Sequence, residues 1–172
     1  MNPSTPLVAL LSVIGLSACV TTYQAPKDTP ATATMTFARD AKTSLLGSTT
    51  VFVKVADDFT CRPGRGFLQT QRLAVFDTGN PFIKDSEGNE LIVEAGDDFR
   101  MLVRNLSGKA RCDTIVSFDV QSDASYHLLA KSNLTPNNTN CFVELYQKDD
   151  TGNTTPIKFK QYQNCQQGFF RG

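Results

Sequence analysis

The stretch STTVFVKVAD, residues 48–57, decides the fold class. Valines occupy every second position from Val51 to Val55, and larger or polar side chains lie between them. Successive side chains of a β-strand point to opposite faces, so this spacing predicts a strand with one valine face. Phe52 and Lys54 would then lie on the other face. A sheet with one apolar face must bury that face against another sheet.

Similar segments recur along the chain, separated by clusters of Gly, Asn and Asp that favour turns. They are TATMTFAR (32–39), QRLAVFD (71–77), ELIVEAG (90–96), DFRMLVRN (98–105), DTIVSFDVQ (113–121), SYHLLAKS (125–132) and a final hairpin that turns at residues 150–153. Only ARDAKTSLLG (38–47) suggests as much as one helical turn. We therefore expect an all-β fold, an antiparallel sandwich of about eight or nine short strands, either immunoglobulin-like or transthyretin-like.

The N-terminal segment has a different character. Its uninterrupted apolar run, residues 6–20, is shorter than the ~20 residues that a helix needs to cross a bilayer. The length suits the apolar core of a secretory signal, which ends in small residues at a cleavage point. The run ends in Leu16, Ser17, Ala18 and Cys19, which resemble the lipobox of bacterial lipoproteins.

This resemblance implies a processing step and a location. The signal peptide would comprise residues 1–18, and diacylglycerol would be joined to the thiol of Cys19, whose new amine is also acylated. Residues 19–30 would form a lipidated N-terminus and flexible tether, and residues 31–172 the sandwich domain. Val20, in place of the Asp that retains such proteins at the inner membrane, implies sorting to the outer membrane. The covalent lipid on Cys19 is the one attached group we expect, and no cofactor or metal is predicted.

The five cysteines divide into one and four. With Cys19 lipidated, Cys61, Cys112, Cys141 and Cys165 form an even set in an exported chain, which predicts two disulfides. Three connectivities are possible. We favour Cys141 with Cys165, because they bracket the final hairpin, and by elimination Cys61 with Cys112. None of these cysteines has the C-x-x-C spacing of a redox or zinc site.

Residues suited to catalysis or metal binding are few. The single histidine, His127, is expected to be structural, because no Gly-x-Ser-x-Gly elbow accompanies it. Acidic pairs occur at residues 57–58, 97–98 and 149–150, but no loop around them has the spacing of a calcium site. We therefore predict solvated turns at these pairs, no catalytic residue and no metal site.

Charge and loop composition narrow the choice of partner. Seventeen basic residues balance seventeen acidic ones, so no net field favours nucleic acid. The loop CRPGRGF (61–67) holds Arg62 and Arg65, whose guanidinium groups suit a carboxylate or other anion, and we predict a possible interaction loop there.

Together these features predict a non-catalytic, lipid-anchored envelope protein. It would act as a binding or assembly component at the outer membrane, with an envelope protein or a cell-wall element as partner. Three alternatives stay open: a periplasmic module that binds a small ligand or carbohydrate, a hydrolase whose carboxylates come together from distant turns, and an inhibitor of foreign hydrolases.

Overall fold

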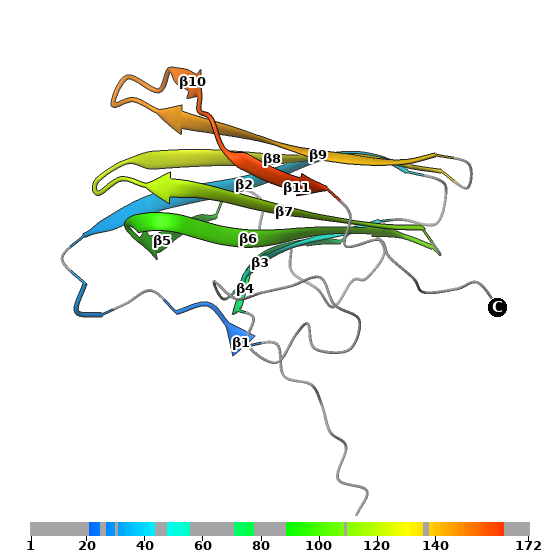
Figure 1. Ribbon diagram of the computed structural model, residues 1–172, viewed down its shortest axis with the longest axis horizontal. Helices are drawn as coiled ribbons and strands as arrows, with labels where there is room; N and C mark the ends of the chain where they lie inside the picture. The colour runs from blue at the N-terminus through cyan, green and yellow to red at the C-terminus, as the bar shows by residue number, and fades with distance from the viewer. Residues whose placement is uncertain are drawn as a thin grey trace, which may run out of the picture.

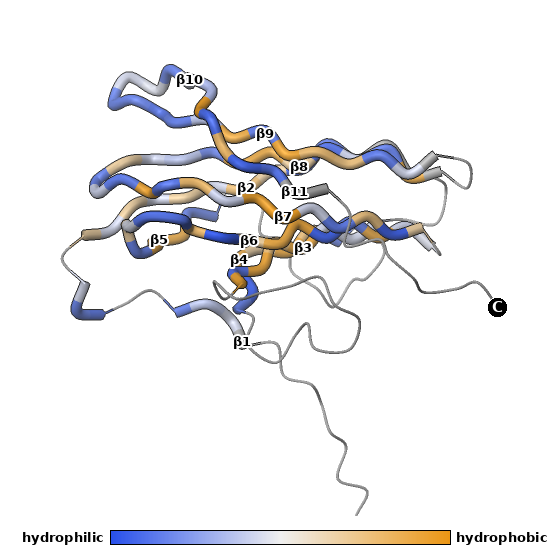
Figure 2. Tube along the Cα trace, viewed as in Figure 1, coloured by the Kyte–Doolittle hydropathy of each residue, from blue (hydrophilic) through white to orange (hydrophobic). Residues whose placement is uncertain are grey.

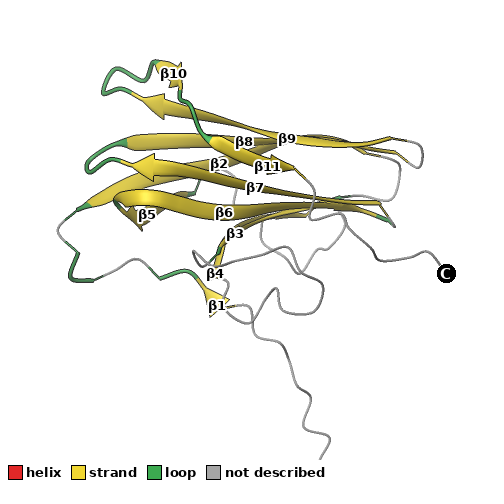
Figure 3. Cartoon of the chain, viewed as in Figure 1, coloured by secondary structure: helices red, strands yellow, loops and turns green. Residues whose placement is uncertain are grey.

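The computed structural model describes residues 21–24, 27–29, 31–43, 48–55, 71–77, 89–108, 110–135 and 138–163. All regular secondary structure in these ranges is β-strand (Figure 3). The strands are β1 (Thr21–Thr22), β2 (Thr32–Thr43), β3 (Thr49–Lys54), β4 (Gln71–Asp77), β5 (Glu90–Glu94), β6 (Gly96–Ser107), β7 (Ala110–Val120), β8 (Ser125–Thr135), β9 (Asn138–Lys148), β10 (Thr154–Pro156) and β11 (Lys160–Gln163). In these parts of the chain no helix is long and apolar enough to span a membrane.

The strands form two sheets, which overlap in the view of Figure 1. Sheet A has the order β1-β4-β3-β6-β7-β11, and sheet B has the order β10-β9-β8-β2-β5. Most neighbouring strands are antiparallel, but β1 pairs with β4, and β2 with β8, in parallel. The predicted all-β, two-layered architecture is thus confirmed, although it contains more strands than expected. The final hairpin is confirmed, because β9 and β10 pair on either side of residues 150–153. The short strands β1 and β11 were not expected as separate strands.

The space between the sheets is filled by large apolar side chains. Phe52 is fully buried there, and its ring centroid lies 4.9 Å from that of Phe37 and 6.0 Å from that of Phe76. A second aromatic group places the Phe118 ring 5.8 Å from Phe99 and 5.7 Å from Tyr126. Strands of both sheets contain hydrophobic segments (Figure 2). Burying each such side chain contributes about 1.5–3 kcal/mol.

The alternation in β3 is confirmed. While Phe52 faces the core between the sheets, Val53 and Val55 join Leu102 and Ile115 in a separate buried cluster. Since these four residues alternate with core residues along their strands, the cluster lies on the outer face of sheet A. Sheet A therefore buries apolar side chains on both faces.

The sandwich has two unlike ends (Figure 1). At the hairpin end, β6 turns directly into β7 and β8 turns into β9 within the same sheet. At the crossover end, the chain changes sheets between β5 and β6 and again between β7 and β8. We use these two names below.

Strand β2 continues where a helical turn was expected. Its residues from Thr34 to Thr43 pair with β8 in an unbroken parallel register, so the helical prediction is wrong for residues 38–43. Hydrogen bonding to a neighbouring strand outweighs a weak local preference for helix.

The chain before β2 contacts the sandwich at β1, inside the segment expected to be a free tether. Thr21 and Thr22 pair with Gln71 and Arg72 of β4, at the crossover end. Tyr23 then packs into the main core with only 6% of its surface exposed. The N-terminal segment is therefore fixed to the domain at these three residues.

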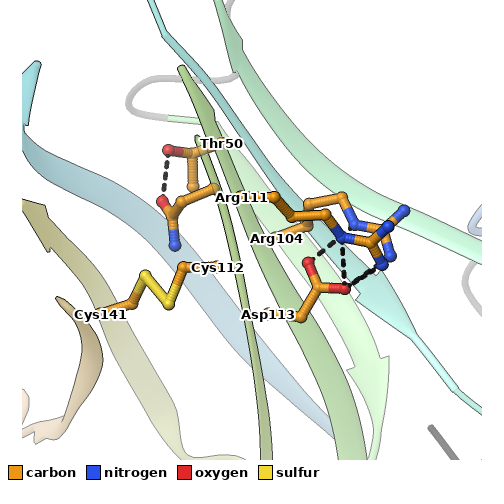
Figure 4. Close-up of a disulfide and its surroundings, with 7 residues drawn as sticks. Thr50, Arg104, Arg111, Cys112, Asp113 and Cys141 are labelled. Atoms are coloured by element: carbon orange, nitrogen blue, oxygen red, sulfur yellow. Dashed lines mark hydrogen bonds and ion pairs between the residues drawn. A yellow bond between two sulfur atoms is a disulfide. The ribbon is translucent and has the colours of Figure 1, made fainter. Parts of the chain in front are cut away.

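The described disulfide joins Cys112 of β7 to Cys141 of β9, with 6.2 Å between their Cα atoms (Figure 4). Both predicted pairings, Cys141 with Cys165 and Cys61 with Cys112, are therefore wrong. The two cysteines belong to different sheets, and each lies near the beginning of its strand at the hairpin end. The physical reason is the packing of β7 against β9 across the sandwich, which sequence spacing does not reveal.

Candidate binding site at the crossover end

A β-bulge at the beginning of β6 shapes the candidate site. Gly96 pairs with Val120 of β7 and Phe99 pairs with Phe118, so two residues of β6 lie opposite the single residue Asp119. Such a bulge bends the strand and redirects its side chains. Asp98 adopts a positive φ of 57°, a conformation that Asp tolerates better than most residues. Its backbone N–H donates to Oδ1 of Asp119 over 3.0 Å.

The bulge borders a pocket of about 230 Å³. We call it the bulge pocket. It is lined by residues 94–100 together with Lys54 and Val55 from the end of β3. The backbone N–H of Val55 donates to the carbonyl of Arg100 over 3.2 Å, which fixes the end of β3 against β6. Strands far apart in sequence thus form its walls.

Lys54 is held in this pocket by aromatic rings. Its Nζ lies 5.5 Å from the ring centroid of Tyr23 and 5.4 Å from that of Phe99. A cation at this distance is attracted by the negative face of a ring. The rings position the ammonium but provide no hydrogen-bond acceptor for its three N–H groups.

Two kinds of charge line the pocket. Arg100 and Asp98 form an ion pair, and Ser117 Oγ also donates to the Asp98 carboxylate. These two hydrogen bonds lower the pKa of Asp98. The ion pairs between described residues include none of Lys54, Glu94 and Asp97. One cation and two anions therefore line the same pocket without pairing with each other.

Tyr23 connects the pocket to the N-terminal segment. Its hydroxyl accepts a 3.4 Å hydrogen bond from the backbone N–H of Glu94, and its ring lies beneath Lys54. Burial raises the pKa of the Tyr23 hydroxyl. Tyr23, which directly follows β1, thereby contacts two of the residues that line the pocket.

A second polar cluster surrounds Asp113, on the outer face of sheet A (Figure 4). Arg104 donates to both carboxylate oxygens, from Nε over 2.8 Å and from a terminal nitrogen over 2.7 Å. Arg111 donates to Oδ2 through Nε over 3.0 Å and also forms an ion pair. Burial opposes ionisation of Asp113, but the hydrogen bonds from Arg104 and Arg111 outweigh it and lower its pKa. We interpret this cluster as structural, because the Asp113 carboxylate accepts its hydrogen bonds from Arg104 and Arg111 of the same chain.

The predicted site residues have different outcomes. Cys19, Arg62, Arg65, Cys61 and Cys165 lie outside the described residues, so their roles stay predictions.

His127 lies in β8 on the outer face of sheet B, as the alternation of its strand predicts. Its Nδ1 is 3.0 Å from the hydroxyl oxygen of Thr36. Partial burial, and then the positive charge of Lys148, lower the pKa of His127. The interactions are those of a partly buried strand residue that packs on its neighbours.

Of the acidic pairs, the one at residues 149–150 forms a turn. The Asp149 carboxylate accepts hydrogen bonds from Thr151 and Asn153, at 2.7 to 3.2 Å. The pair at residues 97–98 forms the bulge. In the parts of the chain that the structure describes, no three His, Cys, Asp or Glu side chains are grouped to hold a metal ion.

The bulge pocket was missed in the sequence. Lys54 was correctly placed on the Phe52 face of its strand, and Asp97 was noted only as half of an acidic pair. The available signal was Gly96, because an isolated glycine within a strand pattern marks a bulge. Comparison with protein-family models, with curated proteins and with solved structures gives no match to this chain.

Proposed function

We propose that this chain is a lipid-anchored component of the bacterial cell envelope that works by binding and not by catalysis. The observation that carries the proposal is the lipobox-like sequence Leu16-Ser17-Ala18-Cys19, which is followed within two residues by the docked strand β1. Cleavage before Cys19 would leave a lipidated cysteine immediately beside the sandwich. Val20 supports sorting to the outer membrane.

Binding is the activity that the geometry supports best. The bulge pocket holds charges of both signs, available for a ligand, on rigid strands that meet at one end of the fold. This observation favours a ligand-binding role within the envelope, with the Arg62 and Arg65 loop as a further candidate contact for an envelope protein or cell-wall partner.

We infer a transthyretin-like sandwich as the finer fold class. Leaving out the three short strands, the sheets have the orders β4-β3-β6-β7 and β5-β2-β8-β9. An immunoglobulin-like sandwich has its first strand next to its second and its third beside its sixth. Here the first strand of this set, β2, lies between β5 and β8 instead. The strand order therefore supports the transthyretin-like class over the immunoglobulin-like class.

We also infer a second disulfide, between Cys61 and Cys165. These two cysteines remain once Cys19 is lipidated and Cys112 is joined to Cys141. An exported chain favours oxidation of such a remaining pair. Peptide mapping under non-reducing conditions should recover a peptide containing both residues, and recovery of both as free thiols would contradict the inference.

The test of lipidation is Cys19→Ala in cells fed radiolabelled palmitate. The unchanged chain should incorporate label and run at the processed size, whereas the variant should stay unlabelled and unprocessed. Cys61→Ala, which also removes a thiol but leaves the lipobox intact, should be labelled normally. Normal labelling and processing of Cys19→Ala would refute the anchor.

A further inference from the structure

The bulge pocket lies close to the expected lipid anchor. Tyr23, which contacts both Glu94 and Lys54, is only four residues after Cys19. Four residues of extended chain span at most about 14 Å. If Cys19 carries lipid, as the proposed function holds, the crossover end of the sandwich must stay near the surface of the bilayer. Phospholipid headgroups are then the molecules at the highest local concentration around the pocket.

The charges of the pocket match a headgroup with two charges. Lys54 offers three N–H donors and no described carboxylate neutralises it, while Glu94 and Asp97 offer carboxylate acceptors. A phosphate accepts strong hydrogen bonds from an ammonium, and a primary ammonium donates them to carboxylates. A ligand that carries a phosphate and a primary ammonium a few bonds apart could therefore bind Lys54 through the phosphate and the two carboxylates through the ammonium.

We propose that the bulge pocket binds the headgroup of a phospholipid that carries a phosphate and a primary ammonium, as in phosphatidylethanolamine. Lys54 donates to the phosphate, and Glu94 and Asp97 accept from the ammonium. The Arg100–Asp98 pair supports the bulge and keeps these two carboxylates in place. The pocket has room for the headgroup, whose acyl chains remain in the bilayer. This contact orients the domain, because it adds a second point of attachment to the lipid on Cys19.

The direct test measures binding of a soluble headgroup, sn-glycero-3-phosphoethanolamine, to the full chain in detergent by calorimetry. We expect a dissociation constant in about the millimolar range. Lys54→Met and Glu94→Gln should each weaken binding about tenfold or more, since each removes a charge-assisted hydrogen bond. The control Lys148→Met removes an exposed lysine of β9 that does not line the pocket, and should bind like the unchanged chain. Circular dichroism of each variant checks that the fold is retained.

Other probes distinguish the sources of the same chemistry. Glycerophosphocholine, which has no N–H donors, should bind more weakly than the ethanolamine compound. Inorganic phosphate and free ethanolamine, each supplied alone, should also bind more weakly. Equal binding of phosphate alone would show a simple anion site, and tighter binding of glycylglycine would show a site for peptide zwitterions. Either result, or no binding of the headgroup at about 10 mM, would overturn the proposal.

Headgroup binding and palmitate labelling, both measured on the unchanged chain, separate this inference from the proposed function. Headgroup binding without lipid labelling of the unchanged chain would refute the anchor but leave the pocket's specificity standing. Lipid labelling without headgroup binding would support the anchor and refute the proposed ligand of the bulge pocket.

Discussion

Asp113 shows how one residue can control the stability of a strand surface. Only 2% of its side chain is exposed, and its carboxylate is enclosed by Arg104 and Arg111. Moving a carboxylate out of water costs several kcal/mol unless other charges and hydrogen bonds replace the water. The side chain of Arg104 is itself only 16% exposed, so both members of this ion pair are largely removed from water.

Replacing Asp113 by Asn should therefore destabilise the domain. The amide keeps the shape but removes the negative charge to which Arg104 and Arg111 donate, and we expect a loss of about 3 kcal/mol in the free energy of unfolding. Urea denaturation at neutral pH measures this loss. The control Asp150→Asn changes an exposed turn residue and should alter stability by less than about 0.5 kcal/mol. An equally small effect of Asp113→Asn would show that the cluster does not support the fold.

The same carboxylate predicts a dependence of stability on pH. The pKa of Asp113 is lower in the folded chain than its ordinary value of 3.8, so the unfolded state binds the proton more readily. Its contribution to stability is therefore fully present above about pH 4 and is lost as the pH falls through the lowered folded value. Below about pH 4 the unchanged chain should lose stability more steeply than Asp113→Asn. Parallel slopes would mean that other acids account for the acid sensitivity.

Among the elements, the short strand β1 is followed by a large buried side chain, that of Tyr23. Tyr23 follows directly after it, is nearly buried, and donates its backbone N–H to the carbonyl of Arg72 over 2.9 Å. Tyr23→Ala should cost about 2–4 kcal/mol in the free energy of unfolding, because it leaves a cavity in the main core. It should also expose the N-terminal segment to limited proteolysis. Thr22→Ala, which changes an exposed neighbour, provides the control. Unchanged stability and proteolysis in Tyr23→Ala would support a free tether.

The inter-sheet disulfide is a second device at the level of elements. Cys112 and Cys141 are separated by 29 positions, and closing a loop of this length stabilises the fold by about 3.5 kcal/mol in the chain-entropy description. The double variant Cys112→Ala with Cys141→Ala should lose stability of that order in urea. Adding reductant should lower the free energy of unfolding of the unchanged chain. The double variant lacks this bridge, so its free energy of unfolding should fall less. Non-reducing peptide maps should contain Cys112 linked to Cys141, and a link from Cys141 to Cys165 would contradict the structure.

The sequence predicts a feature when the feature depends on residues close together in the chain, and misses it when the feature depends on contacts between distant strands. The strands were found because alternation is local: β4 spans residues 71–77 as expected, and Phe52 and Val53 face opposite ways. The disulfide was not found, because it depends on which strands meet across the core. The bulge pocket was missed for the same reason, since it joins the end of β3 to the beginning of β6 and to Tyr23.

At the scale of the whole molecule, the two ends of the sandwich have different tasks. The hairpin end is joined across the sheets by the disulfide, whereas the crossover end holds β1 and the bulge pocket. A lipid on Cys19 would bring the crossover end toward the membrane and turn the hairpin end away from it. The hairpin end is therefore the part of the described domain best placed to meet a partner outside the bilayer.

The parallel pairing of β2 with β8 has a consequence for how the domain acquires its structure. Thr36 contacts His127, 91 positions later in the chain, so the centre of sheet B joins distant segments. Closing a loop of that length costs about 4 kcal/mol before any contact repays it. The hairpins β6–β7 and β8–β9 are local and can form early, whereas both neighbours of β2 in sheet B, β5 and β8, lie far along the chain. Folding should consequently be slow for a chain of this size. The part of β2 beyond Thr36 pairs only with β8 in the described structure, so it stays an unpaired, aggregation-prone edge until β8 is in place. If the chain is exported from its N-terminus, as the proposed function holds, that strand would emerge long before β8, and a chaperone that shields extended chains would then aid its folding.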